Sequence, residues 1–200
     1  VLLFLLEQRV VDLDDRLGDL LGSIEVPEEK SNIRLGQLMS HCSGLTAHKP
    51  YYRELLAIGP EMRKTYLLEK ILFEPLQYRP SEKHLYSDLG FLLLGAIIEE
   101  KTDSSLADLY SKKVVKPLGL EEDLLFPLSG DLNISNCAAT EICPWTHRLL
   151  CGRVHDDNCR ALGGVAGHAG LFGTVKGVLG VCDWLTQLWN GSGQEGGIST

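Results

Sequence analysis

The stretch YSDLGFLLLGAIIEEKT, residues 86–102, contains the most apolar segment of the chain and decides the expected fold. The apolar side chains between Leu89 and Ile98 do not keep to one face of the 3.6-residue period and cover nearly the whole circumference of a helix. A helix that is apolar on every side has to be surrounded by other elements. The sequence therefore predicts a core helix from Ser87 to Thr102, at the centre of a helical lobe.

Further helices are predicted on both sides of this core helix. Apolar periodicity, capping residues and the prolines and glycines that follow place them at 33–39, 62–74 and 104–115. The first has Ser31 or Asn32 as its candidate cap, and the third has Ser104. In the second, Tyr66, Leu67, Ile71 and Phe73 are the expected apolar contacts. Together these segments predict a helical lobe over about residues 30–120.

The second half of the chain has a different pattern. Residues 121–173 have no sustained periodicity and are punctuated by prolines and glycines, so they are expected to form a mostly irregular crossing. A last helix is predicted over 174–190, because Thr174 is a good cap, the apolar residues from Val178 to Trp189 follow helical spacing, and Gly191 can end it.

Composition excludes several classes of protein. The chain has 200 residues, with 19 Lys and Arg against 27 Asp and Glu, for a net charge of -8. An acidic chain is a poor ligand for nucleic-acid phosphates, so no nucleic-acid partner is expected. The longest apolar runs, 1–6 and 91–98, are far shorter than the roughly 20 residues of a transmembrane helix. The run 1–6 lacks the basic lead and cleavage site of a signal peptide, so no targeting signal is recognised.

Tyr86-Ser87-Asp88 is the strongest single candidate for chemistry, because it lies between a polar loop and an apolar helix. The positive potential of a helix N-terminus favours a phenolate, so Tyr86 is a candidate general base. The negative charge of Asp88 acts in the opposite direction. The alternative interpretation is a tyrosine that only packs at the helix entry.

The glycine-rich segment 163–170 contains Gly167 and His168 and invites comparison with phosphate-binding loops. It lacks the GKS or GKT of a P-loop and the GxGxxG frame of a dinucleotide site. Two interpretations stay open: a tight loop that leads into a helix, and a loop that borders a pocket.

Metal and nucleophile patterns are weak in this sequence. Six cysteines form no CxxC pair, and six histidines form neither HxH nor HExxH. His155 and Asp156 could bind a metal only with help from distant residues. Ser43 lacks the glycine two positions earlier that a GxSxG elbow needs. No metal and no cofactor are therefore expected.

Several motifs occur in an order and spacing that resemble one family, the serine β-lactamase-related hydrolases, which include class C β-lactamases, D,D-peptidases, D-aminopeptidases and related esterases. Residues 33–45, IRLGQLMSHCSGL, resemble the family segment TIRHLLTHTSGL. Tyr86-Ser87-Asp88 aligns with the second catalytic motif, YxN. Segments that resemble a narrower subgroup are ATE at 139–141, VHDDN at 154–158 and LGGVAGHAGLF at 162–172.

The resemblance implies an α+β protein of the β-lactamase/transpeptidase-like fold, here mainly its helical lobe with most of the antiparallel sheet missing. It implies an acyl-enzyme mechanism on amide, lactam or ester bonds, in which Tyr86 exchanges the proton of a serine nucleophile. Asp88, Gly167 and His168 are the expected substrate-binding residues, with a small molecule or peptidoglycan-like peptide as substrate. The expected location of the full-length protein is extracytoplasmic.

Two family motifs are missing from these 200 residues. No serine is followed by lysine three positions later, so the SxxK nucleophile is absent, and no KTG or HTG triplet occurs. We therefore expect the chain to be an internal piece that is inactive by itself, with the apolar faces of 1–6 and 178–189 exposed. A noncatalytic binding or structural module that retains the helical lobe is the alternative function.

Overall fold

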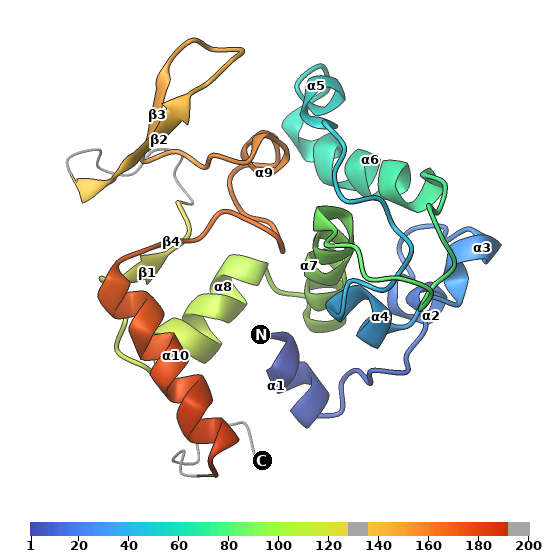
Figure 1. Ribbon diagram of the computed structural model, residues 1–200, viewed down its shortest axis with the longest axis horizontal. Coiled ribbons are helices and arrows are strands. Elements are labelled where there is room, and N and C mark those ends of the chain that lie inside the picture. The colour runs from blue at the N-terminus through green and yellow to red at the C-terminus, as the bar shows by residue number, and fades with distance from the viewer. Residues whose placement is uncertain (128–135, 192–200) are drawn as a thin grey trace.

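Helices dominate the fold, which Figure 1 shows in chain order; this computed structural model describes residues 1–127 and 136–191. The helices are α1 (Leu2–Glu7), α2 (Leu17–Leu20), α3 (Glu28–Ser31), α4 (Leu35–Met39), α5 (Tyr52–Leu55), α6 (Pro60–Phe73), α7 (Asp88–Thr102), α8 (Leu106–Tyr110), the π-helix η1 (Ser111–Val115), α9 (Asp157–Ala161) and α10 (Val175–Trp189). The strands are β1 (Leu124–Leu125), β2 (Ala139–Ile142), β3 (Leu149–Cys151) and β4 (Phe172–Gly173).

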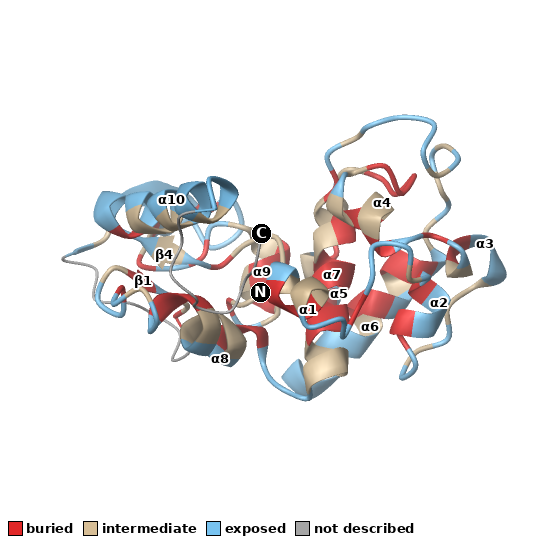
Figure 2. Ribbon diagram, turned by 90° about the horizontal axis from the view of Figure 1, so that it is seen from below, coloured by how far each residue is buried: buried red, intermediate tan, exposed pale blue. Residues whose placement is uncertain are grey.

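α7 is the central element, as the sequence predicts. It contacts α2, α4, α6 and α8, and its residues Leu89, Leu93 and Ile97 have no exposed surface. Figure 2 shows buried residues concentrated on α7 and on the helices that face it. The Ser87 hydroxyl caps the helix by accepting a hydrogen bond from the Gly90 amide at 3.3 Å. The left-handed Asp103 ends it.

The helices around α7 agree with the prediction in place but differ in detail. α6 begins two residues earlier than predicted, with Pro60 at its first turn. The expected inward contact of Phe73 is wrong, because its side chain is 62% exposed. Phe73 follows the buried Ile71 by two positions, which is a rotation of about 200° around a helix and turns it to the opposite face.

In contrast to α6, the predicted helices 33–39 and 104–115 begin later than predicted. Residues 28–31 form the separate helix α3, and α4 starts after Arg34, whose amide donates to the Gln37 side chain at 2.8 Å. The predicted helix 104–115 is capped by Ser105, which accepts from the Asp108 amide, and it changes to π geometry at Ser111. A single π-turn is an insertion in the helical hydrogen-bond pattern that periodicity alone does not reveal.

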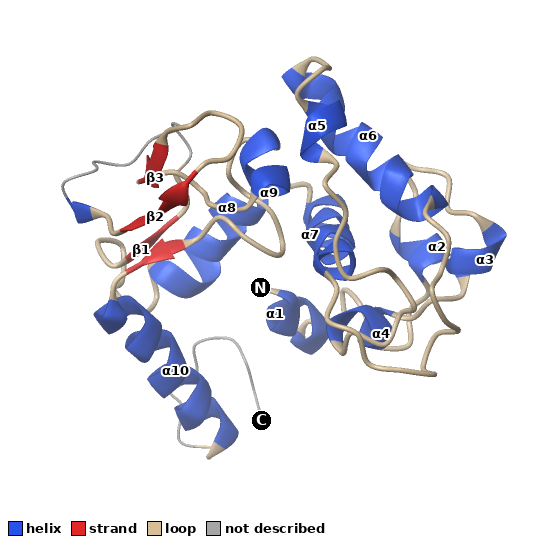
Figure 3. Ribbon diagram, turned by 45° about the horizontal axis from the view of Figure 1, so that its top comes forward, coloured by secondary structure: helices blue, strands red, loops and turns tan. Residues whose placement is uncertain are grey.

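The described residues of the segment 121–173 carry short regular elements within irregular chain. β1 and β4 pair antiparallel, with Leu124 opposite Gly173, and β2 and β3 form a second antiparallel pair. Figure 3 shows these strands together on the side of the molecule away from α2 and α3. The β1–β4 pairing brings the glycine-rich segment back to the end of the helical lobe.

The apolar face of α10 is largely exposed, as expected. Thr174 caps this helix by accepting from the Gly177 amide, and Gly191 follows it with a φ of 67°. Val178 is 54% exposed and Trp189 is 89% exposed. The same expectation is wrong for part of α1, because Phe4 and Leu5 are buried there. Within the described residues, no helix is both long and apolar enough to cross a membrane.

Candidate active site

Tyr86 lies on the ring of His41, just before α7. The two ring centroids are 4.5 Å apart, and the His41 ring also stacks on Phe91, with centroids 4.9 Å apart. The Ser87 amide donates to Nδ1 of His41 at 3.1 Å, and the Leu85 amide donates to the His41 carbonyl at 3.0 Å. His41 adopts a left-handed φ of 57°, which is uncommon for a residue other than glycine. Tyr86 itself is 66% exposed, so its hydroxyl is accessible to a substrate.

Ser87 holds a neighbouring loop against the start of α7. Its buried hydroxyl donates to the Thr46 carbonyl at 2.7 Å, and the Asp88 amide donates to the Ala47 carbonyl at 2.9 Å. This attachment places His48 beside Asp88, with Nδ1 3.1 Å from Oδ2. The predicted substrate-binding residue Asp88 therefore already has a charged or hydrogen-bonding partner within the chain.

Asp156 and His168 form a second pair near the first. Oδ1 of Asp156 accepts from the Cys159 amide at 2.7 Å, which caps α9, and lies 2.9 Å from Nε2 of His168. The His168 side chain is 2% exposed and that of Asp156 is 22% exposed. Burial tends to raise the pKa of Asp156, but the hydrogen bonds from His168 and Cys159, with the nearby His48, bring the pKa below its ordinary value.

Asn158 joins the two pairs through the backbone. Its fully buried side chain accepts from the Tyr52 amide at 2.8 Å and donates to the Lys49 carbonyl at 2.8 Å. Both partners are more than 100 positions away from Asn158 in the sequence. Since Asn158 follows Asp156 by two positions and Lys49 follows His48, the clamp brings these two side chains together.

Gly167 packs directly on the backbone of α7. A Cβ atom at this position would lie 2.0 Å from the Phe91 carbonyl oxygen and 3.0 Å from the Gly95 amide nitrogen. Only glycine fits such an approach without a shift of the backbone. The contact holds the glycine-rich segment 163–170 beside the helix that presents Asp88, and it accounts for Gly167 by steric fit.

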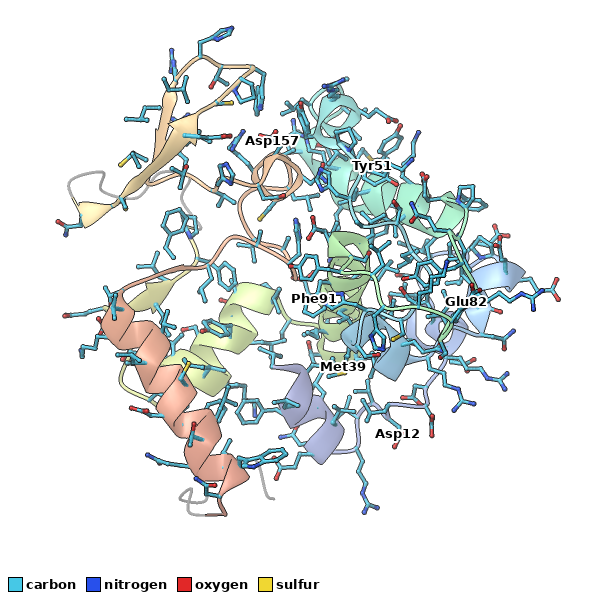
Figure 4. All side chains as sticks on the ribbon, in the orientation of Figure 1. Asp12, Met39, Tyr51, Glu82, Phe91 and Asp157 are labelled. Atoms are coloured by element: carbon cyan, nitrogen blue, oxygen red, sulfur yellow. The ribbon has the colours of Figure 1, made fainter. Side chains whose placement is uncertain are left out.

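Two cavities border this glycine-rich segment, in agreement with the pocket interpretation. One, of about 510 Å³, is lined by Met39, Phe91, Leu94, Tyr110 and His168 among others. Met39 and Phe91 are labelled in Figure 4, where they lie at the centre of the molecule next to α1. The other, of about 270 Å³, lies between α6, α7 and the segment 162–167. Both are mainly apolar, as small-molecule sites usually are.

The structure thus places the four predicted site residues at or beside the N-terminal half of α7. Tyr86 and Asp88 flank the capping serine, while Gly167 and His168 come from the glycine-rich segment. His48 and Asp156 connect Asp88 to His168, and sequence reasoning did not assign either of them to the site. The VHDDN segment at 154–158 was a signal for Asp156, but its neighbour His155 points elsewhere, to Glu141 at 3.1 Å.

Comparison with known proteins identifies the family. The sequence model of the Beta-lactamase family matches residues 1–194. The chain belongs to the Beta-lactamase family. Its β-lactamase/transpeptidase-like fold, mainly helical with two small antiparallel sheets in the described residues, confirms the fold class that the motifs predict.

Curated relatives of this Beta-lactamase family chain carry a peptidase name. A protein of Escherichia coli K12 named "Putative D-alanyl-D-alanine carboxypeptidase" is 33% identical over 177 residues, which cover 80% of this chain and 41% of that protein. A protein of the same name from Salmonella agona is 32% identical, over 84% of this chain and 40% of that protein. The chain therefore spans about two fifths of the length of these relatives.

Solved structures agree with the fold of the Beta-lactamase family. A penicillin-binding protein from Bacillus halodurans has a TM-score of 0.68 at 16% identity, over 95% of this chain and 56% of that one. The octameric penicillin-binding protein homologue from Pyrococcus abyssi has a TM-score of 0.66 at 18% identity, over 99% of this chain and 43% of that one. These identities support a common fold and nothing finer.

Proposed function

We propose that this chain supplies the tyrosine and part of the substrate-binding wall of a serine hydrolase that works through an acyl-enzyme. The single observation that carries the proposal is the position of Tyr86, exposed at the N-terminus of the buried helix α7 and supported on the His41 ring. Membership of the Beta-lactamase family and the peptidase names of the relatives support the reaction class. The proposed bonds are amides, lactams or esters, with D-alanyl peptides of the cell envelope as the first class to test.

The proposed role of Tyr86 is proton transfer. In such a reaction a serine hydroxyl attacks the carbonyl carbon and its proton passes to a base. As the bond to the leaving amine or alcohol breaks, the base returns this proton to the leaving nitrogen or oxygen, and the acyl group stays on the serine. A tyrosine hydroxyl can perform both transfers when it lies beside the nucleophile. These 200 residues contain no SxxK motif. A complete enzyme therefore needs a nucleophilic serine from sequence outside them.

Asp88 and His168 are proposed to contact the substrate rather than to react. Asp88 has a carboxylate where the YxN motif has an amide, so it can accept hydrogen bonds but cannot donate one. Its Oδ2 atom lies 3.1 Å from Nδ1 of His48, so His48 borders the same part of the wall. His168 reaches the mainly apolar cavity of about 510 Å³, which suits the acyl part of a small substrate. A peptidoglycan-like substrate would require an extracytoplasmic location.

The second candidate function is a noncatalytic binding module. Such a module would need neither SxxK nor KTG or HTG, which these 200 residues do not contain. The coding DNA separates the two functions: in-frame SxxK upstream and KTG or HTG downstream favour the enzyme, and a start codon next to Val1 favours the module.

The catalytic role is tested with Tyr86→Phe in the full-length gene product. This change removes only the hydroxyl, so the ring contact with His41 stays and the fold is expected to survive. We expect turnover of a D-alanyl-D-alanine peptide or a chromogenic ester to fall roughly 100-fold to 10,000-fold, as for the loss of a general acid or base.

Tyr66→Phe is the matched control. The Tyr66 hydroxyl bonds to Glu54 between α6 and α5, outside the site, so this variant loses a hydrogen bond but keeps its turnover. Unchanged turnover in Tyr86→Phe, with a lowered melting temperature, would remove Tyr86 from the catalytic residues.

A further inference from the structure

Three side chains with metal-binding atoms meet beside the proposed active site. They are His48 from the loop before α5, Asp88 at the start of α7, and Asp156 at the cap of α9. One ligand atom from each lies within 4.8 Å of the other two. The three segments are far apart in the sequence, which is why no metal motif is visible in it.

The spacing and the chemistry of these atoms suit one small divalent cation. Nδ1 of His48 and Oδ2 of Asp88 are 3.1 Å apart. Two ligands on the same tetrahedral Zn²⁺, each at about 2.1 Å, lie about 3.4 Å apart, so this pair needs little rearrangement. Imidazole with carboxylates is a donor set for Zn²⁺ and its neighbours rather than for Ca²⁺ or Mg²⁺, which prefer oxygen alone.

We propose that His48, Asp88 and Asp156 form a binding site for one divalent transition-metal ion such as Zn²⁺. One carboxylate oxygen of Asp156 lies within 4.8 Å of the ligand atoms of His48 and Asp88. The Cys159 amide and Nε2 of His168 both bond to Oδ1 of Asp156, so neither of them occupies Oδ2. Asp88 and Asp156 together supply two negative charges, which neutralise a divalent ion.

His168 orients the carboxylate of Asp156. Its side chain is 2% exposed, its Nε2 points at Asp156, and its Nδ1 has no hydrogen-bond partner among the residues that the structure describes. A buried imidazole that holds a metal-binding carboxylate is the arrangement by which outer residues orient the ligands of a metal. His168 is accordingly a positioning residue for Asp156.

The ligands are also held in place by the fold. Asn158 fixes the loop of His48 to α9, and the Ala47 carbonyl fixes Asp88 through its amide. The N-terminus of α7 carries partial positive charge, which opposes a cation. Two full carboxylate charges at short range outweigh that opposition.

The site has a consequence that rests on the proposed function. Asp88 follows Tyr86 by two positions and is a proposed substrate contact, so a bound cation and the substrate would share this carboxylate. The cation site itself depends only on the geometry of its ligands. Metal binding and turnover can therefore fail independently.

The experiment measures metal binding directly on the purified protein, with no substrate present. Free cysteines are first blocked with N-ethylmaleimide, because thiolates bind the same metals. Zn²⁺ is titrated by calorimetry, and Co²⁺ by its visible absorption, which reports its coordination. We expect one equivalent to bind with a roughly micromolar or lower Kd.

Variants assign the ligands. His48→Gln and Asp156→Asn are expected to weaken binding at least 10-fold, and His168→Gln by roughly 10–100-fold, as for the loss of an outer-shell partner. His155→Gln is the matched control, since His155 is adjacent in sequence to Asp156 but pairs with Glu141, and it should bind as the unchanged protein does. His48 is half exposed, so His48→Gln should fold even if Asp156→Asn does not.

Two results would overturn the site. One is the absence of saturable Zn²⁺ and Co²⁺ binding to the blocked, folded protein. The other is an unchanged affinity in folded His48→Gln, which would place the metal elsewhere.

Discussion

Asn158→Ala is expected to be among the most destabilising single changes in the chain. The side chain of Asn158 has no exposed surface and makes two hydrogen bonds of 2.8 Å, one from the Tyr52 amide and one to the Lys49 carbonyl. Alanine removes both bonds and has no polar side-chain atom to replace them. The Tyr52 amide and the Lys49 carbonyl are then left without their partners.

The magnitude follows from counting these groups. A partly buried backbone group that loses its partner costs about 1–3 kcal/mol, so two such groups cost about 2–6 kcal/mol. For a domain of about 200 residues, 1 kcal/mol corresponds to about 2–4 °C in melting temperature, so a loss of about 3 kcal/mol lowers Tm by about 6–12 °C. The loop of His48 should also separate from α9.

Urea denaturation and thermal melts of Asn158→Ala measure this loss, and Asn190→Ala is the control. Asn190 lies exposed at the end of α10, so its replacement should change the free energy of unfolding by less than about 0.5 kcal/mol. If Asn158→Ala loses less than about 1 kcal/mol, the clamp does not join the two halves of the site and the reasoning from its hydrogen bonds is refuted.

Two further predictions concern the same region. Gly167→Ala should lose about 3 kcal/mol of stability, because its Cβ would meet the Phe91 carbonyl at 2.0 Å, whereas Gly90→Ala in α7 should be neutral or gain up to about 1 kcal/mol in a urea titration. Equal effects of the two changes would contradict the close contact. Asp156 has a lowered pKa in the folded protein, so its ionised form adds stability above its ordinary pKa of 3.8, and this stability is lost as the pH falls through the lower folded pKa. Asp156→Asn should therefore be less stable than the unchanged protein at pH 7, with a difference that shrinks below about pH 4; a constant difference in urea midpoints would count against this.

The helical lobe was predictable because its signals are local. The apolar side chains and the serine cap of the stretch 87–102 predict a buried helix, and both features are present in α7. The sequence predicted less well which side chains of a helix are buried. Phe73 belongs to α6 as expected but faces solvent, since apolar character does not decide which side of a helix a neighbour covers.

The site was only half predictable, because its contacts are long-range. Tyr86 and Asp88 stand in one short motif, and motif reasoning finds them. His48 is 40 positions from Asp88, and nothing in its own neighbourhood indicates that they meet. The same is true of Asn158, whose partners are more than 100 positions away. Such pairs depend on how the chain returns past α7, which periodicity does not encode.

The return of the chain past α7 explains why stability and the proposed chemistry depend on the same contacts. Gly167 presses the glycine-rich segment onto Phe91 and Gly95, and this places His168 where it can hold Asp156. Phe91 also supports the His41 ring, on which Tyr86 rests. A side chain added at Gly167 would thus disturb α7 at Phe91, the residue that supports the His41 ring. The proposed proton donor and the proposed cation ligands therefore share one structural support, although they come from separate segments.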